Sequence, residues 1–293
     1  MIWFALSLGA ALTQATQFAV VKGRARDIPP FVIVTWTQAV AAGTWALYFL
    51  ISGHRVAVPR SAWPAIVVSA LLVTGMSSLL ARANARGDIS IVGPVFALSP
   101  IFTVLPDAVL SGTWPRGFGW LGLALSVMGT LSLSGGGVTL AGRLRTLLAR
   151  QDALDALGAA ILLGFLAAVD RWGALALGPP SYLICSHGAT GLLSGAIALA
   201  TTPRGLAASA APRNLVTMLA HGLLGVTGTG MQTAALTMAP AAYVNAIRRM
   251  SSILAVMLGR ALFREPDLGR GSPPRCSPPP APPASSSPTE AGC

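Results

Sequence analysis

The segment from Phe31 to Ile51, FVIVTWTQAVAAGTWALYFLI, decides the fold class, because its 21 residues include no charged side chain. Roughly 20 apolar residues in a helix cross the hydrocarbon core of a bilayer, and a helix satisfies its own backbone hydrogen bonds there. Pro29 and Pro30 lead into the segment, and Arg55 is the next charged residue after it. The segment is therefore predicted to be a membrane-spanning helix.

Similar segments recur along the chain and predict nine spans in all. They are Trp3–Val21, Phe31–Ile51, Trp63–Ala81, Ile89–Leu110, Phe118–Ser134, Leu154–Val169, Tyr182–Ala200, Leu215–Leu236 and Ala241–Leu262. No basic stretch precedes the first segment, so it is predicted to be a retained helix and not a cleaved signal peptide. The composition agrees, because 53% of the residues are hydrophobic and 10% are charged, against about 25% charged in soluble domains. The fold class is predicted to be all-α integral membrane.

The net charge of +11 does not indicate nucleic-acid binding. The basic residues stand singly or in small groups between the apolar segments and form no stripe with interleaved aromatic residues. We interpret them as topology determinants and as partners of lipid headgroups. The predicted partners are thus the lipid bilayer and not nucleic acid.

The sequence contains no pattern typical of an enzyme, a cofactor site or a metal centre. Cys185, Cys276 and Cys293 form no CxxC pair and have no histidine at metal-ligand spacing, which argues against a disulfide framework and a metal site. No hydrolase elbow, zinc-protease, Walker A or dinucleotide-binding motif occurs in a fitting context. We expect no enzymatic activity, no cofactor and no ATP-driven step.

The chain repeats itself at nearly constant spacing. Pro29-Pro30-Phe31 recurs as Pro179-Pro180-Ser181, 150 residues later. Ser99-Pro100-Ile101 matches Ser251-Ser252-Ile253, and Phe18–Lys22 is similar to Leu166–Asp170. These matches predict two homologous five-helix halves. Because five is an odd number, the second half enters the membrane inverted, which is an inverted-repeat transporter architecture.

The repeat divides the chain into four predicted parts. They are a first five-helix repeat over residues 1–137, a loop over 138–153, a second repeat of four helices over 154–268 and a Pro/Ser-rich tail over 269–293. The tail has no apolar run, so we expect it to be disordered and the tenth helix to be missing. A frameshift after Gly269 and a natural nine-helix variant are both open explanations.

Several motifs together resemble the EamA-type permeases of the drug/metabolite transporter superfamily. They are the loop from Ser52 to Trp63, the run Ser99-Pro100-Ile101-Phe102, the segment Ala241–Arg249 and the segment Leu258–Pro266. The resemblance covers about residues 3–268 and implies a ten-helix secondary carrier in the cytoplasmic (inner) membrane. The first half carries Gly112-Thr113-Trp114 where the second carries Arg264-Glu265-Pro266, so the acidic residue is absent there.

The orientation in the membrane is left open by two conflicting signals. The resemblance implies a cytoplasmic N-terminus. Odd-numbered connections and the tail hold fourteen Lys and Arg residues against six in the even-numbered connections, and the positive-inside rule would place the N-terminus outside.

Two adjacent arginines in the ninth predicted span are the first candidates for a substrate pathway, because charges at membrane depth are costly. Arg248 and Arg249 lie about two helical turns into that span. Asn245, Arg249 and Ser252 share one helical face. This face could line a water-filled pathway and bind an anionic group, or the arginines could extend to lipid headgroups.

Further candidates are polar or aromatic residues near or within other spans, namely Gln14, Gln17, Gln38, Gln232, Asp170, Trp36 and Tyr243. The amides could line the pathway or hydrogen-bond between helices. Asp170 could bind a cation, pair with an arginine across the bundle, or pair with its neighbour Arg171. Trp36 and Tyr243 could form an aromatic wall or anchor helices at the membrane surface.

The sequence thus predicts a secondary transporter that moves a small metabolite by alternating access of two halves. The other hypothesis is a non-transporting polytopic membrane protein, such as a degenerate paralogue or an assembly partner. The substrate is an unknown small molecule, and a homodimer is one assembly that such a carrier could form.

Overall fold

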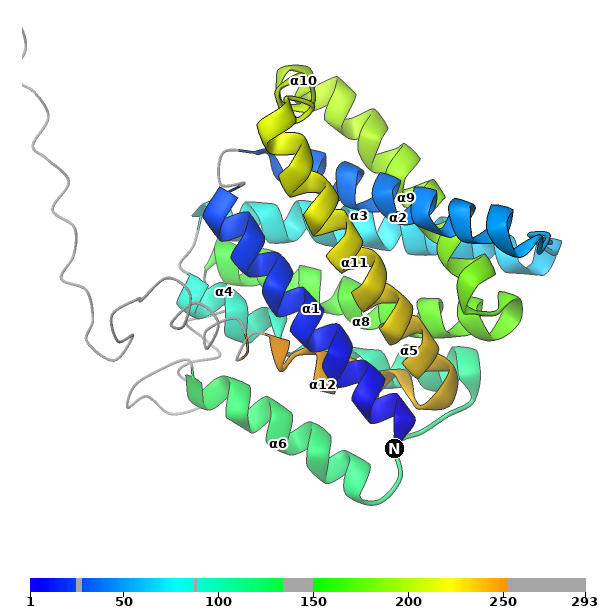
Figure 1. Cartoon of the computed structure of the whole chain (residues 1–293). Coiled ribbons are helices and arrows are strands. Elements are labelled where there is room, and N and C mark those ends of the chain that lie inside the picture. Colours follow the sequence, from blue (N-terminus) through cyan, green and yellow to red (C-terminus); the bar gives the residue numbers. More distant parts are fainter. Residues whose placement is uncertain (25–27, 87–88, 134–149, 252–253, 255–293) are drawn as a thin grey trace, which may run out of the picture.

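The structure, a computed structural model, describes residues 1–24, 28–86, 89–133, 150–251 and 254. Within these ranges every regular element is a helix (Figure 1). The predicted tail over 269–293 and most of the predicted loop over 138–153 lie outside the described residues. The all-α fold class is confirmed for the described part of the chain.

The first half of the chain supplies the elements up to residue 133. They are α1 (Ile2–Arg24), α2 (Pro30–Ser52), the 3-10 helix η1 (Arg60–Ala62), α3 (Trp63–Arg86), α4 (Ile89–Phe96), α5 (Ser99–Ser111) and α6 (Phe118–Leu133). The second half supplies α8 (Gln151–Leu177), α9 (Pro179–Thr201), α10 (Pro203–Ser209), α11 (Pro212–Met238) and α12 (Ala241–Arg248). α2, α9 and α11 each have proline in the first turn, where its fixed φ suits a helix and its missing N–H is not needed.

Four of the described segments are long and apolar enough to cross a membrane. They are Pro30–Ser52, Arg60–Arg86, Gln151–Leu177 and Pro179–Thr201. The shortest of them has 23 residues, or about 34 Å at 1.5 Å per residue, which exceeds the hydrocarbon core of about 30 Å. These segments make the chain a multi-pass membrane protein by length and composition. The full count of nine spans stays a prediction.

The fourth predicted span, Ile89–Leu110, differs from the structure because it is broken into α4 and α5. The break falls at Ala97 and Leu98, just before the proline that occupies the first turn of α5. Proline disfavours the helical conformation of the residue before it and donates no backbone hydrogen bond. A second proline, Pro106, is accommodated inside α5.

The ninth predicted span also differs, because α12 ends at Arg248. The amide of Met250 donates to the carbonyl of Ile247 at 2.9 Å, a three-residue spacing that tightens the chain into a turn. Arg249 therefore lies in the turn after α12 and not in the middle of a long helix. Residues 252–253 and 255–262 of the predicted span lie outside the described residues.

α8 is the most enclosed of the four candidate spans, with 67% of its most apolar window buried, whereas the corresponding value for α2 is 11%. It is longer than the predicted span Leu154–Val169 and continues to Leu177. It contacts α3 and α5 of the first half and α9 and α11 of the second half. The bundle is thus organised around α8, and α2 presents most of its surface outward.

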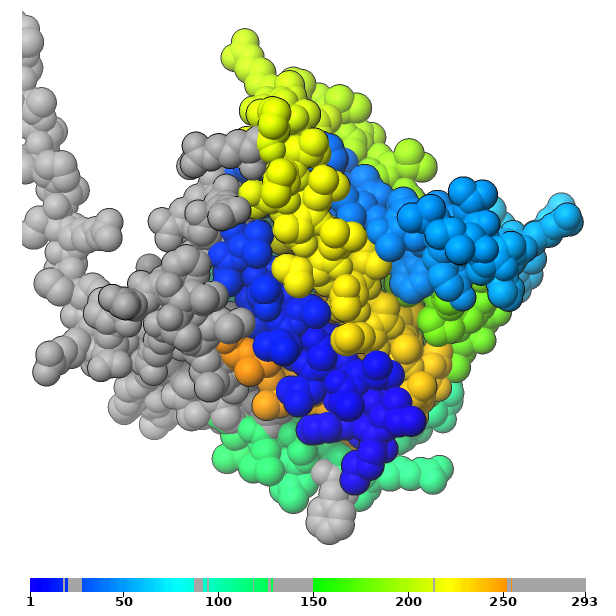
Figure 2. All heavy atoms as spheres, in the orientation of Figure 1, coloured from blue at the N-terminus to red at the C-terminus, as the bar shows by residue number. Residues whose placement is uncertain are grey.

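Helices of the two halves pair reciprocally. The first helix of one half contacts the third of the other in both directions, as α1 with α11 and α3 with α8. The second helices, α2 and α9, contact each other, and so do α5 and α12 from the two fourth segments. Figure 2 shows α1 (blue) and α11 (yellow) packed side by side along the visible face. Each half is therefore interleaved with the other.

Glycine allows three pairs of helices to approach closely. On α11, a methyl group at Gly222 would lie 2.6 Å from Val40 of α2, and one at Gly228 would collide with Thr13 of α1. On α8, a methyl group at Gly164 would lie 2.6 Å from the backbone of Phe102 in α5. At each of these positions the absence of a side chain lets two helix backbones approach closely.

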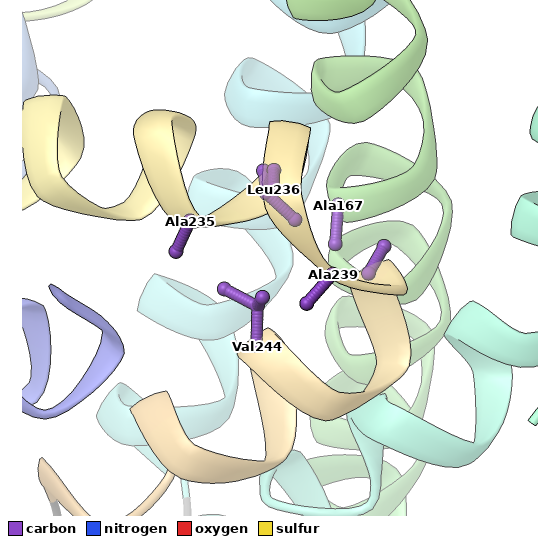
Figure 3. Close-up of a cluster of buried hydrophobic side chains, with 6 residues drawn as sticks. Ala167, Ala235, Leu236, Ala239 and Val244 are labelled. Carbon is purple, nitrogen blue, oxygen red and sulfur yellow. The ribbon is translucent and has the colours of Figure 1, made fainter. Parts of the chain in front are cut away.

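A cluster of small apolar side chains joins the second-half helices where α11 turns into α12. Figure 3 shows Ala235 and Leu236 of α11, Ala239 of the turn and Val244 of α12 converging with Ala167 of α8. All are at most 5% exposed. This cluster fixes the start of α12, the helix that carries Arg248.

Candidate functional site

Arg248 occupies a polar cluster formed by helices of both halves. Its Nε donates to Oε1 of Gln14 in α1 at 3.0 Å, and its Nη1 donates to Oε1 of Gln232 in α11. Ser251 donates to the same Gln14 oxygen at 3.4 Å. Three predicted site residues, Gln14, Gln232 and Arg248, are thus brought together, and neutral amide oxygens hold the guanidinium.

Arg249 lies beside this cluster but has different surroundings. Its residue is 9% exposed, and its guanidinium carbon lies 5.2 Å from the ring centre of Phe96 in α4. Its Nε is buried without a hydrogen-bond partner among the described residues. Arg249 is therefore a buried charge that lies over an aromatic ring and has a donor without a partner in the described part of the chain.

Asn245 connects α12 to α5. Its Nδ2 donates to Thr103 at 3.0 Å and to Ser99 at 3.4 Å. Asn245 and Arg249 thus both face the fourth segment of the first half, as their spacing predicts. Ser252, the third member of the predicted face, lies outside the described residues.

Asp170 does not pair with its neighbour Arg171. Its Oδ1 accepts hydrogen bonds from Ser69 of α3 at 2.9 Å and from Tyr182 of α9 at 2.6 Å. Adjacent residues of a helix point in different directions, which is why the predicted alternative of an Asp170–Arg171 pair is wrong. Asp170 instead interacts electrostatically with Arg248 across the bundle.

Arg171 forms a buried ion pair with Asp107 of α5, at 2.9 Å, with the two side chains 9% and 2% exposed. Arg171 also donates to the carbonyl of Leu236 at 3.0 Å and to Thr113. The second Asp107 oxygen accepts the backbone N–H of Ala241 at 2.8 Å. This network, the Asp107–Arg171 lock, ties α5 of the first half to α8, α11 and α12 of the second.

Another set of ion pairs joins the halves near the start of α8. Asp155 pairs with Arg82 at 3.0 Å and with Arg86 at 3.4 Å, both from the end of α3. The two arginine side chains are 54% and 57% exposed. Asp155 and Arg171 are sixteen residues apart on one helix, or about 24 Å, so the two ionic contacts lie toward opposite ends of α8.

The buried histidines and the remaining amides form hydrogen bonds between helices. His187 Nδ1 lies 2.5 Å from Gln38 Oε1, and its Nε2 lies 3.3 Å from Thr229. Gln17 donates to the carbonyl of His221 at 3.0 Å. In this conformation Gln17 and Gln38 connect helices, the second of the two roles that the sequence allows.

Trp36 and Tyr243 pack against different elements. The indole N–H of Trp36 donates to Ser209 of α10 at 2.8 Å. The hydroxyl of Tyr243 accepts the backbone N–H of Arg116 at 3.0 Å and lies against Gly119 of α6. The hydrogen bonds of Trp36 and Tyr243 thus lead to different elements and do not indicate the shared aromatic wall that the sequence allows. Among the described residues no group of three or more His, Cys, Asp or Glu residues could hold a metal ion.

Sequence reasoning missed the Asp107–Arg171 lock. It treated Arg171 only as one possible partner of Asp170. The two locked residues are 64 positions apart, so no local pattern links them. The available signal was the cost of leaving either charge alone inside a membrane bundle, which requires an opposite partner.

The described part of the chain is a polytopic helical bundle with charged residues in its interior, an arrangement that recurs in membrane transport proteins. Residues 1–135 match the model of the EamA-like transporter family, which confirms the resemblance to EamA-type permeases over the first half of the chain.

A crystal structure of another protein shares the fold with a TM-score of 0.69. The superposition covers 91% of this chain and 90% of that one, at 20% sequence identity. At this identity the likeness shows the fold alone. No curated protein matches the sequence.

Proposed function

We propose that this protein is a secondary transporter that moves a small metabolite across the cytoplasmic membrane by alternating access of two inverted halves. The observation that carries the proposal is the reciprocal pairing of helices from the two halves around buried polar side chains. The EamA-like match over residues 1–135, which ends close to the predicted end of the first repeat, supports the same division.

The directions of the paired helices support an inverted repeat. In α2 and α9, Thr35 contacts Ser194 and Gln38 contacts His187, so one helix rises in number as the other falls. Antiparallel helices that occupy equivalent places are exchanged by a two-fold axis perpendicular to them. For spanning helices such an axis lies in the membrane plane, as in inverted-repeat carriers.

The two ionic contacts on α8 support alternating access, because both join a first-half helix to the second half. The Asp107–Arg171 lock is almost fully buried, whereas Arg82 and Arg86 are more than half exposed. We assign these contacts as the two gates. The conformation is then closed at the Asp107–Arg171 end and more accessible at the Asp155 end.

The proposed pathway between the two gates is lined by the candidate residues around the end of α12. Arg248 and Arg249 from the end of α12, with Gln14 and Gln232 beside them, form its polar centre. Asp170 lies within electrostatic reach of Arg248. Energy for transport would come from an ion or solute gradient, since the sequence holds no nucleotide-binding motif. We propose no enzymatic step.

Uptake into proteoliposomes tests the transport function. The purified full chain is reconstituted, and counterflow of radiolabelled metabolites from a broad panel is compared with protein-free vesicles. Saturable exchange of at least one solute is expected. Absence of exchange across the panel would instead favour the non-transporting alternative. That alternative is based on the predicted loss of a tenth helix, which concerns residues outside the described part of the chain.

Arg249→Ala is expected to abolish that exchange without loss of the folded state, because the side chain has no hydrogen-bond partner on Nε among the described residues. Arg60→Ala is the matched control, since Arg60 is exposed in η1. Unchanged transport kinetics in Arg249→Ala would remove Arg249 from the pathway.

A further inference from the structure

The two arginines at the end of α12 form no ion pair within the described part of the chain. Arg248 contacts the neutral oxygens of Gln14 and Gln232. Arg249 adds a second positive charge directly beside it, and the two repel each other. A buried pair of like charges of this kind attracts any anion that reaches it.

The acidic residues of the described part are engaged elsewhere. Each has its own partners: Asp107 with Arg171, Asp152 with Arg150, Asp155 with Arg82 and Arg86, and Asp170 with Ser69 and Tyr182. Asp170 influences Arg248 only at longer range. Within the described ranges, no carboxylate therefore stands within ion-pair distance of either arginine.

The geometry of Arg249 specifies which anions fit. The guanidinium carbon lies over the ring of Phe96, 5.2 Å from the ring centre, while Nε on the edge of the guanidinium has no partner in the described chain. The edge of a guanidinium carries parallel N–H donors that match the two oxygens of a carboxylate or phosphate. The Phe96 ring offers no hydrogen-bond acceptor of its own to that edge, and Nε stays without a partner in the described chain. The unused donor is thus suited to a planar or tetrahedral oxyanion.

We propose that Arg249 binds the anionic oxygen group, a carboxylate or a phosphate, of the transported solute, and that Arg248 is a fixed positive neighbour held by Gln14 and Gln232. This assignment rests on the proposed transport function, because it takes the bound anion to be part of the transported solute. It divides the two arginines, which the sequence treats alike, into a binding residue and a positioning residue. With Asp170 included, the formal charges of the three side chains sum to +1, so a net positive charge faces the anion.

Binding is tested first, without transport. Thermal unfolding of the purified full chain is followed in a sugar-based detergent, which contains no phosphate, during titration with inorganic phosphate, benzoate or neutral benzamide at constant chloride. Phosphate or benzoate is expected to raise the melting temperature in a saturable way, because a ligand that binds only the folded state stabilises it. Benzamide is expected to give no shift.

Three variants identify the residue responsible. In Arg249→Gln the affinity for the anion is expected to fall by about tenfold or more, as expected when a charge-assisted hydrogen bond is lost. Its melting temperature without anion is expected to equal or exceed that of the wild type, because an unneutralised buried charge is removed. Arg249→Lys keeps the charge but lacks the planar edge and is expected to bind more weakly than the wild type. Arg60→Gln is the exposed control and is expected to behave as the wild type.

Several results would overturn the proposal. An anion response that persists in Arg249→Gln excludes Arg249 as the binding residue, and so does a wild-type chain that gives no response. Failure of Arg249→Gln to fold shows that the arginine has a structural role, which contradicts its lack of a partner.

The source of the anion is resolved in nanodiscs. If phosphatidylglycerol suppresses the response to benzoate and phosphatidylcholine does not, the group belongs to a lipid headgroup and the solute assignment fails. Equal responses in both lipids support a solute.

The outcome is separable from that of the transport assay. Anion binding without counterflow would refute transport and keep the site. Counterflow of a neutral solute that Arg249→Gln leaves unchanged would refute the site and keep transport.

Discussion

Replacing Asp107 by leucine tests whether the Asp107–Arg171 lock holds the two halves together. The substitution removes the carboxylate that lies 2.9 Å from Arg171 and 2.8 Å from the backbone N–H of Ala241. Arg171, 9% exposed, keeps only neutral acceptors, the carbonyl of Leu236 and the hydroxyl of Thr113. Breaking a buried pair from one side costs about 3–5 kcal/mol, since it leaves a buried charge without compensation.

The assay is equilibrium unfolding in mixed micelles, with sodium dodecyl sulfate as denaturant and helical circular dichroism as signal. Asp155→Leu is the matched control, because Asp155 also joins the halves but pairs with arginines that are more than half exposed. Ion pairs of that kind contribute about 0–1 kcal/mol. The free energy of unfolding is therefore expected to fall several times more for Asp107→Leu than for Asp155→Leu.

A double-mutant cycle with Arg171→Met completes the test. When both charges are removed, no uncompensated ion remains, so the double variant is expected to be more stable than Asp107→Leu alone. A loss in Asp107→Leu no larger than in Asp155→Leu, or single effects that simply add in the double variant, would refute the reasoning.

Two further substitutions test the packing and the polar interior. Gly164→Ala is expected to destabilise the protein by about 1–3 kcal/mol in the same unfolding assay, because the new methyl group meets the backbone of Phe102, which cannot move aside; Gly43→Ala, with no atom within 4 Å of the new group, should not lose stability. Tyr182→Phe is expected to cost about 1.5–3 kcal/mol, since it removes a 2.6 Å hydrogen bond to the Asp170 carboxylate. A wild-type free energy of unfolding in either Gly164→Ala or Tyr182→Phe would contradict the corresponding contact.

Much of the helical framework could be predicted from apolar length and proline position. The predicted span Phe31–Ile51 corresponds to α2 (Pro30–Ser52), and Tyr182–Ala200 corresponds to α9 (Pro179–Thr201). Both helices have proline at their first turn, and both are bounded by polar or Gly-containing connections. Local signals were sufficient because a spanning segment must form all its backbone hydrogen bonds within itself.

Contacts between distant segments could not be predicted in the same way. The partner of Arg171 depends on how α5 and α8 cross, and that crossing depends on Gly164 meeting Phe102. The sequence identified Arg248 as important, but its ligands on α1 and α11 come from packing across the two halves. The residue type alone identifies a charge that is costly to bury, whereas the tertiary packing determines which residue becomes its partner.

The position of Gly164 has a mechanical consequence for α8. This glycine touches the α5 backbone nine residues after Asp155 and seven before Arg171, close to the midpoint between the two charged contacts. A stiff helix that pivots near its middle moves its two ends in opposite directions. In the proposed transport cycle, we expect this backbone contact to be the pivot of α8, so that a rotation about it loosens one ionic contact while it draws the other together.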